Sequence, residues 1–451
     1  MSKTSPDSLS RRSFLQKTTL ASAAATAFPA IMRGQKDGVT STNRVNLAFV
    51  GVGGRGHNAI EALVDENIVA FCDVDDARAE ENYTKYPDVP KFRDYREMFA
   101  EMADKIDGVV ITTPDHMHFP IAMTAIAHGK HVYVEKPLTQ TVEEARLLTE
   151  AARKAGVVTQ MGNQGHSNEG TRLTKEWIQA GVLGEIREVH SWTNRPIWPQ
   201  GQPLPDHSKM LPVVPKTLDW ELWQGVAPTR EYDPAFLPFS WRGWWDYGCG
   251  AFGDMACHIM DATYWGLDLG SPTALEAFSS KMTDHSCPVS SVVKYEFAAR
   301  GSQPALTWKW YDGGLTPPFP KDWEEGRSYY RDGSGTMIIG SEASLVNSTY
   351  GASPRIFPET KMRSIAPNLP AKTLPRVETS NHHLAWCNAI RDNRQPASNF
   401  EYAGPFTETV LLGNAAIRAN RRLEFDAKNV RFTNVESANQ YLSKTYRPGY
   451  F

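Results

Sequence analysis

The sequence predicts an α/β protein built from two parts, a doubly wound parallel sheet followed by an α+β domain with a large, mostly antiparallel open sheet. Between residues 44 and 165, short apolar runs rich in β-formers alternate with helical patterns, which is typical of parallel sheets. After residue 165 the alternation ends and strand-like runs follow one another. The 451 residues are also too many for one ordinary core, which favours two domains.

The first part, residues 44–165, contains five expected strands separated by helices. The strands are expected at 45–52, 68–74, 108–113, 131–135 and 157–161. Helical patterns lie at 59–64, 122–128 and 143–155, and the last of these begins with Thr141 and Glu144 at the spacing of a capping box. In a sheet of this kind, ligands bind beyond the carboxyl ends of the strands.

The second part, residues 166–451, is expected to begin with a strand at 185–193. A loop rich in proline and tryptophan follows at 196–238, and then a glycine-punctuated helical segment at 248–265. Further strand-like runs lie at 274–279, 290–297, 305–311, 336–339 and 344–346. Helical patterns at 382–391 and 407–421 come near the end of the sequence.

Residues 1–31 have the layout of an export signal of the twin-arginine type. Arg11 and Arg12 precede an apolar, alanine-rich run at 18–31 that is too short for a comfortable membrane span. Cleavage after Ala27 would suit the small-residue rule. We therefore expect passage through the twin-arginine translocase to the periplasm or another exported location. The alternative is a basic tail followed by a helix.

The composition excludes several classes of partner. Lys and Arg number 48 against 51 Asp and Glu, so the net charge of −3 gives no reason to expect nucleic acid or an anionic membrane surface. The five cysteines contain no CxxC pair, and the histidine pairs at 116/118 and 382/383 lack spaced partners, so no metal site is expected. The 13 tryptophans gather mainly between 177 and 265, where they line a pocket or pack a core.

A glycine-rich turn follows the first expected strand. Gly51, Gly53 and Gly56 form G-x-G-x-x-G, with Gly54 and Arg55 inside it, directly before a helical pattern. Such glycines permit a tight turn and a close approach of backbone to a pyrophosphate, whose charge the helix N-terminus stabilises. The turn therefore predicts a dinucleotide site; the alternative is a glycine-rich turn with no ligand.

An acidic residue completes this pattern. Asp73 ends the second expected strand, 20 residues after Gly53. A carboxylate at that place accepts hydrogen bonds from the ribose hydroxyls and repels a 2′-phosphate. Asp73 therefore favours NAD over NADP.

Two further motifs carry acid–base chemistry. Glu135-Lys136-Pro137 follows the fourth expected strand, at the edge where a nicotinamide would lie. Asp254 and His258 are four residues apart, which places them on one face of a helix, and a carboxylate beside an imidazole is a common way to hold a general base. Alone, the first motif is a common surface tripeptide and the second an ordinary helix histidine.

The order of these motifs, with Thr113-Pro114 between them, resembles that of the Gfo/Idh/MocA oxidoreductases. Gly162-Asn163-Gln164, the run at 181–186 and the late helix at 407–409 support the resemblance, which covers residues 44 to 425. It identifies the family but not a substrate. It also implies a Rossmann fold for the first part and a homo-oligomer formed through the open face of the second sheet.

The resemblance assigns roles to residues. Lys136, Asp254 and His258 match the catalytic trio: His258 takes the proton of a hydroxyl group while hydride leaves the same carbon for the nicotinamide, and Lys136 orients the oxygen. Residues implied to lie against the cofactor are Thr112, Thr113, Pro114, His118, Glu135, Lys136, Asn163 and Gln164. His118 has an equal alternative as a structural histidine. Candidates for substrate contact, each with scaffold as the alternative, are Trp192, Arg195, Trp198, Arg242 and Trp244.

Together these features predict an exported NAD(P)-dependent oxidoreductase acting on the CH–OH groups of sugars or polyols. Because the periplasm has no generous pool of free NAD, we expect the nucleotide to be tightly bound. Two alternatives remain: an NAD-dependent glycoside hydrolase or lyase that works by transient oxidation and elimination, and a non-catalytic sugar-binding protein.

Overall fold

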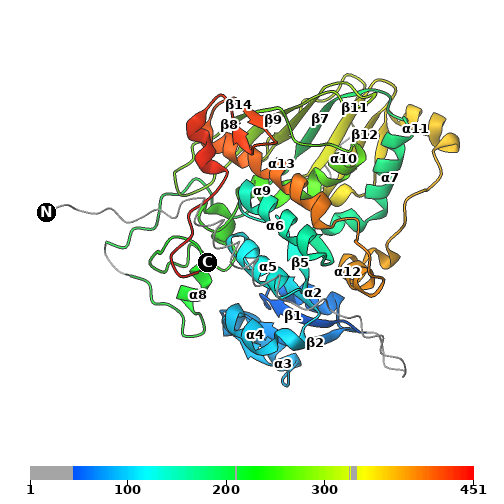
Figure 1. The fold of residues 1–451 in the computed structure, drawn as a ribbon. Helices are drawn as coiled ribbons and strands as arrows, with labels where there is room; N and C mark the ends of the chain where they lie inside the picture. The colour runs from blue at the N-terminus through cyan, green and yellow to red at the C-terminus, as the bar shows by residue number, and fades with distance from the viewer. Residues whose placement is uncertain (1–43, 209–210, 325, 327–332, 451) are drawn as a thin grey trace, which may run out of the picture.

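The chain forms two sheets with helices packed between them (Figure 1). The computed structural model describes residues 44–208, 211–324, 326 and 333–450, so the expected export signal at residues 1–31 lies outside the described residues. No helix of the described part is long and apolar enough to cross a membrane.

The first sheet is parallel and six-stranded, which confirms the predicted doubly wound architecture. Its spatial order is β3-β2-β1-β4-β5-β6, so the direction of winding reverses between β1 and β4. Ligands of such sheets bind at this reversal. The strands are β1 (Asn46–Val50), β2 (Asn67–Cys72), β3 (Lys91–Phe92), β4 (Gly108–Ile111), β5 (His131–Glu135) and β6 (Thr159–Gly162).

The helices of the first part are α2 (Arg55–Ala62), α3 (Asp76–Lys85), α4 (Tyr95–Met102), α5 (His118–Ala127) and α6 (Val142–Ala155). The predicted capping box of α6 is present, since the Thr141 hydroxyl accepts from the Glu144 amide and the Glu144 carboxylate accepts from the Thr141 amide. Gly156 ends this helix in the left-handed conformation, with φ 67°.

A helix from the C-terminal half completes the first sheet. α12 (His382–Arg391) contacts α2, and its Trp386 is buried among apolar side chains of β1 such as Leu47 and Phe49. Figure 1 shows α12 beside α2. A segment more than 200 residues beyond the last strand of the parallel sheet thus supplies part of the apolar layer on that sheet.

The second sheet has nine strands in the order β13-β12-β11-β7-β10-β9-β8-β14-β15. Its described pairs are antiparallel except β7 with β10, so the prediction of a mostly antiparallel sheet is confirmed. The strands are β7 (Ile186–Trp192), β8 (Ala274–Ser279), β9 (Ser291–Phe297), β10 (Leu306–Tyr311), β11 (Gly335–Gly340), β12 (Ser344–Ser348), β13 (Arg355–Phe357), β14 (Leu423–Asp426) and β15 (Arg431–Phe432).

The helices of the second part are α7 (Glu169–Gln179), α8 (Trp220–Gln224), α9 (Gly250–Ile259), α10 (Asp261–Gly266), α11 (Glu359–Ile365) and α13 (Phe400–Ala419). α13 packs against α6 of the first part as well as against β8 and α9, and Arg146 of α6 pairs with Glu408 of α13 at 2.7 Å. α13 begins seven residues earlier than the pattern predicted, because Pro405 within it conceals its first turns. One continuous core of buried residues runs through both parts, so the domain boundary near residue 165 stays a prediction.

Candidate active site

The turn after β1 brings the chain into close contact with itself. Gly51 has φ 85° and its amide donates to the Cys72 carbonyl at 2.8 Å. A Cβ on Gly56 would lie 2.1 Å from the Gly51 carbonyl oxygen, and one on Gly53 would lie 2.4 Å from the Arg78 carbonyl oxygen. Only glycine fits these places, so the turn leaves bare backbone at the start of α2, as a pyrophosphate cradle requires.

Asp73 lies beside this turn and holds it. One carboxylate oxygen accepts from the amides of Val52 at 2.7 Å and Gly53 at 3.2 Å, and the other accepts from the Asp75 amide at 3.0 Å. Burial raises the pKa of Asp73, and the backbone amides oppose that rise. Asp73 therefore fixes the shape of the turn.

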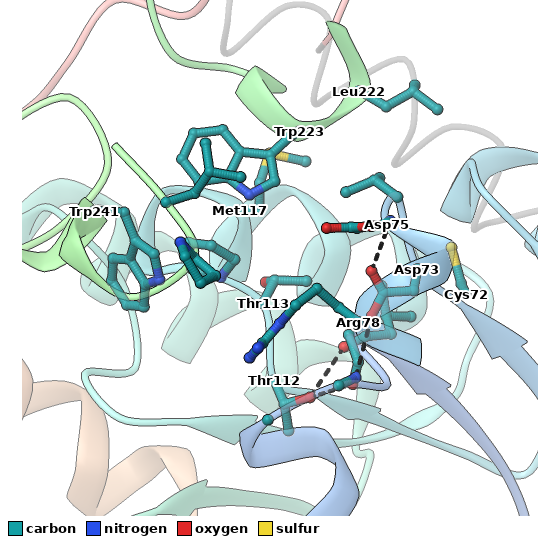
Figure 2. A pocket seen from close by; sticks show the side chains of 18 of the residues that line it. Cys72, Asp73, Asp75, Arg78, Thr112, Thr113, Met117, Leu222, Trp223 and Trp241 are labelled. Carbon is teal, nitrogen blue, oxygen red and sulfur yellow. Dashed lines mark hydrogen bonds between the residues drawn. The ribbon is translucent and has the colours of Figure 1, made fainter. Parts of the chain in front are cut away.

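A cleft of about 320 Å³ opens above the turn. On one side lie Gly51, Gly53, Gly54, Arg55, Asp73, Arg78, Thr112, Thr113 and Pro114. On the other side lie Trp223 and Trp241, which Figure 2 shows facing Asp73, Arg78 and Thr112 across the cleft. The residues expected against the dinucleotide from the turn and from the 112–114 loop thus line one cleft at the reversal of the first sheet.

An aromatic segment of the second part covers this cleft. Residues 218–247 contain a small apolar cluster of their own, formed by Leu218, Trp223, Ala227, Tyr232, Phe236, Trp241, Trp244 and Tyr247. The segment is tied to the first sheet by backbone, since the Asp219 amide donates to Val74 at 2.8 Å and the Asp76 amide donates to Thr217 at 3.1 Å. We call residues 217–247 the aromatic cover.

Lys136, directly after β5, and Asp254, in the middle of α9, form a largely buried ion pair. The Lys136 ammonium lies 2.7 Å from the Asp254 Oδ1 and also donates to the Asp254 carbonyl at 2.9 Å. Arg242 Nε lies 3.2 Å from the same carboxylate oxygen. Burial raises the pKa of Asp254, but Lys136 and Arg242 outweigh it and lower that pKa to about 2. Asp254 is therefore ionised at neutral pH.

His258 lies one turn beyond Asp254 on α9. Its ring is buried and meets the Tyr350 ring edge-on, with the centroids 4.6 Å apart. Its Nδ1 has no hydrogen-bond partner among the described residues. Burial, reinforced by the charge of Lys136, lowers the pKa of His258 well below its usual value. The imidazole is therefore neutral at pH 7 and able to accept a proton.

Glu135 joins three loops around the cleft. Its Oε1 accepts from Arg55 Nε at 3.1 Å and from Gln164 Nε2 at 2.6 Å. Gln164 also donates to the Tyr133 hydroxyl at 3.0 Å. The glycine turn, the end of β5 and the loop after β6 therefore share one polar network, which reaches the cleft through Arg55.

Several residues expected at the site face elsewhere. His118 is buried with its ring nitrogens 2.8 Å and 2.9 Å from the carbonyls of Pro137 and Thr113, so it holds two loops together. Asn163 is buried and does not line the cleft: its side-chain amide donates to Asp261 at 2.9 Å, and its Oδ1 accepts from Ser398 at 2.5 Å. Gly56 does not line the cleft; it lets α2 approach the turn.

Of the five candidates for substrate contact, some lie near Asp254 and others are packed elsewhere in the protein. Arg242 reaches Asp254, and Trp198 lies under Arg242, 5.9 Å from its guanidinium. Trp192 instead packs with Met337, Val346 and Phe357 in a cluster apart from the main core, and Trp244 is buried inside the aromatic cover. Arg195 lies in the loop after β7, partly buried.

Two residues near the trio were not predicted. Asp115 is buried, accepts from the Cys249 amide at 3.1 Å, and has its pKa raised to about 7 by burial. Tyr350 contacts His258 with its backbone at φ 66°. Asp115 directly follows Thr113-Pro114 and could have been singled out on that ground, whereas no sequence signal marks Tyr350. Within the part of the chain that the structure describes, no group of His, Cys, Asp and Glu is placed to hold a metal ion.

Models of one oxidoreductase family match both parts of the chain. Residues 45–163 match the NAD-binding Rossmann fold of the family, and residues 185–306 and 321–451 match its C-terminal alpha/beta domain. The second match alone covers more than half of the chain. The protein therefore belongs to the Gfo/Idh/MocA oxidoreductase family, as the order of its motifs predicted.

Two curated relatives each match about a third of the chain. Glycosyl hydrolase family 109 protein 1 of Shewanella sp. (strain ANA-3) is 33% identical over 154 residues, which make up 32% of this chain and 33% of that protein. Inositol 2-dehydrogenase of Burkholderia multivorans is 30% identical over 152 residues, or 32% of this chain and 44% of that protein. The matched stretch thus spans less than half the length of these relatives.

Solved structures match over most of the chain. The WlbA dehydrogenase from Bordetella pertussis, in complex with NADH and UDP-GlcNAcA, has a TM-score of 0.58 at 18% identity, with 85% of this chain and 99% of that chain covered. The aldose-aldose oxidoreductase from Caulobacter crescentus, complexed with glycerol, has a TM-score of 0.54 at 15% identity, with 85% and 100% covered. At these identities the likeness shows the shared fold.

Proposed function

We propose that this protein is an exported oxidoreductase that transfers hydride between a tightly held NAD and a hydroxyl or ketone carbon of a sugar or polyol. The observation that carries the proposal is the largely buried Lys136–Asp254 pair beside His258, whose Nδ1 has no partner among the described residues; Arg242, which lines the dinucleotide cleft, contacts Asp254 of this pair. Inositol 2-dehydrogenase among the relatives supports a polyol as substrate.

The side chains divide the work as follows. Lys136 donates a hydrogen bond to the substrate oxygen and, as a cation, stabilises the negative charge that grows there as the proton leaves. His258, neutral at pH 7, accepts that proton. Asp254 stays ionised and holds Lys136 in place. The dinucleotide, when bound, supplies the acceptor for the hydride. Arg242, which lines the cleft, would donate to hydroxyl groups of the sugar, and the buried Trp198 packs beside its guanidinium.

The binding of NAD rests on the turn and on Asp73. The bare backbone at Gly51–Gly54 would receive the pyrophosphate, and the Asp73 carboxylate would accept from the ribose hydroxyls and repel a 2′-phosphate. NADP is therefore the less favoured nucleotide. The aromatic cover lies across the cleft and is tied to the first sheet by backbone hydrogen bonds, so it would slow the escape of a bound nucleotide.

Export is proposed from Arg11 and Arg12 and the apolar run at 18–31, through the twin-arginine translocase. Because that route carries folded proteins, the nucleotide would be bound before export. A native mass spectrum of protein purified from the periplasm tests both ideas. We expect the mass of the mature chain plus one NAD(H) per subunit. If the purified protein has the mass of the chain alone and heating releases no NAD(H), the proposal of tight binding is contradicted.

A homo-oligomer is proposed from the face of the second sheet that carries Trp192. Trp192 packs there in a buried cluster with Met337, Val346 and Phe357, and the exposed apolar side chain of this part of the chain on which the proposal rests is Phe319, which is 60% exposed. Light scattering coupled to size exclusion would give the mass in solution. A monomer at micromolar concentration would contradict this proposal.

Glycoside cleavage is the second candidate function, and it is favoured by the relative named glycosyl hydrolase family 109 protein 1. In that cycle a ring hydroxyl is oxidised, the neighbouring C–H becomes acidic, the leaving group is eliminated, and water addition and re-reduction restore the sugar. p-Nitrophenyl glycosides distinguish the two functions. Release of nitrophenol without net formation of NADH would favour cleavage, whereas NADH formation with free sugars would favour the dehydrogenase. A sugar-binding protein without activity would show neither.

A further inference from the structure

A second cleft, of about 280 Å³, lies where α13 meets the C-terminal segment. Its walls come from the later turns of α13, residues 440–445, the start of α6 and the loop at 245–249. The cleft shares no lining residue with the cleft above the glycine turn. We call it the Arg418 cleft, after the residue that distinguishes it.

Arg418 is a cation with no polar partner. Its guanidinium lies 4.4 Å from the Tyr441 ring centroid and 5.2 Å from that of Trp245, and it makes no hydrogen bond or ion pair with any residue that the structure describes. Burial lowers the pKa of this guanidinium. With two aromatic rings against the guanidinium and no acceptor among the described residues, its N–H groups remain free to donate to a ligand within the guanidinium plane. Such an edge suits the two oxygens of a carboxylate.

Asn414 stands one turn earlier on the same helix and lines the same cleft. Its side chain is only 8% exposed, and its Nδ2 donates to the Cys249 carbonyl at 2.9 Å. Its Oδ1 is buried and has no hydrogen-bond partner in the described part of the chain. A buried acceptor without a hydrogen bond destabilises the folded protein, so a donor such as a ligand hydroxyl would bind favourably to this oxygen.

The other charged residues of the Arg418 cleft determine which ligand charge the cleft favours. Lys444 is satisfied by Glu144, at 3.0 Å, and Asp246 is paired with Arg230. Asp284 is exposed at the rim and unpaired among the described residues. A single cation therefore remains free, with two carboxylates nearby. This favours a planar anion of one negative charge and disfavours a phosphate dianion.

We propose that the Arg418 cleft binds a small hydroxycarboxylate, with the ligand carboxylate on the edge of Arg418 and a ligand hydroxyl on Asn414 Oδ1. Sugar acids belong to this chemical class. The site is separate from the proposed redox site, yet Gly248 and Cys249, which line it, immediately precede α9 with Asp254 and His258. The inference goes beyond the proposed function and does not depend on it, because it concerns binding alone.

Isothermal titration of the full-length protein with D-gluconate tests this proposal. D-Glucitol has the same chain of hydroxyl groups without the carboxylate, and acetate has the carboxylate without the hydroxyls. We expect gluconate to bind at least tenfold more tightly than either compound, and more tightly than inorganic phosphate. Gluconate that binds no better than glucitol, or phosphate that binds as tightly as gluconate, would overturn the assignment.

Variants locate the binding. Arg418→Gln removes the free cation, and Arg418→Lys keeps the charge but loses the planar edge, so both are expected to weaken gluconate at least tenfold. Arg421→Gln is the matched control, because Arg421 is exposed three residues further on and its loss removes the same charge. Unchanged gluconate affinity in a folded Arg418→Gln or Arg418→Lys protein, as judged by circular dichroism, would place the ligand elsewhere and refute the proposal.

Discussion

Lys136 contacts Asp254 twice, through the carboxylate at 2.7 Å and through the backbone carbonyl at 2.9 Å. The first residue follows a strand of the parallel sheet and the second lies on a helix of the other part, 118 residues later. The double contact fixes the ammonium group against the first turns of α9. It therefore sets the distance between the end of β5 and His258, which no single hydrogen bond would define as closely.

Replacing Lys136 by Met should abolish most of the hydride transfer. The variant loses the donor to the substrate oxygen, so we expect kcat to fall by about 10²–10⁴-fold. The decrease would be measured in a single turnover, as the absorbance of NADH formed after adding sugar to NAD-loaded protein. Lys85→Met is the control, because Lys85 pairs with Glu61 on the surface. A Lys136→Met rate within threefold of the wild type would refute the assigned role.

His258 should work as a base down to unusually low pH. Its pKa is lowered well below the usual value because burial and the Lys136 charge disfavour the imidazolium. A base with a lowered pKa stays unprotonated as pH falls, so we expect kcat/KM for sugar oxidation to show no decrease due to His258 between pH 8 and pH 6. His258→Gln should lower kcat by about 10²–10⁴-fold at every pH in that range. A decrease centred near pH 6.5 that disappears in His258→Gln would contradict this assignment.

The sequence predicted the parts of the site that depend on local spacing. Strand and helix periods are visible directly in the sequence. They placed the glycine turn after β1, Asp73 at the end of β2, and Asp254 one helical turn from His258. The capping box of α6 was predicted for the same reason. These features involve neighbours in the chain, so tertiary context did not change them.

Features that depend on the path of the chain were not predicted. Trp386 packs beside Gly108 and Leu47, although α12 follows β6 by more than 200 residues. The end of β7 that contains Trp192 is buried on both faces of the sheet. The hydrophobic pattern of the sequence therefore could not indicate which side chains point toward α9. The aromatic cover has no regular period, and its position over the cleft is visible only in the structure, where Trp223 and Trp241 line the cleft and backbone hydrogen bonds tie the segment to Val74 and Asp76.

Asp73 should matter to the shape of the turn as well as to the choice of nucleotide. In Asp73→Asn one acceptor oxygen is replaced by an amide donor that faces backbone N–H groups. We expect a loss of about 1–3 kcal/mol in the free energy of unfolding and about tenfold weaker NAD binding, with less discrimination against NADP. Urea denaturation and titration with both nucleotides would measure these effects. Asp65→Asn, at an exposed position, provides the control, and an unaltered preference for NAD in Asp73→Asn would show that Asp73 does not select the nucleotide.

Asp115 should make the protein less stable as pH rises. Burial raises its pKa to about 7, while Lys136 and Arg242 oppose the rise and Asp254 adds to it. Between pH 4 and pH 7 the unfolded chain loses this proton and the folded chain keeps it, so stability falls with rising pH over that window. At about 1.4 kcal/mol per pKa unit, the loss amounts to at most about 4 kcal/mol above pH 7.

Asp115→Asn removes this loss and keeps an oxygen that can accept from the Cys249 amide. The free energy of unfolding of the variant minus that of the wild type should therefore be larger at pH 8 than at pH 5, because only the wild type loses stability through Asp115 at the higher pH. Urea denaturation of both proteins at the two pH values gives the comparison. The difference between the two proteins is decisive, rather than either value alone, because carboxylates far from Asp115 contribute equally to both proteins and cancel. A difference that is the same at pH 5 and pH 8 would mean that Asp115 ionises in the folded protein as readily as in the unfolded chain.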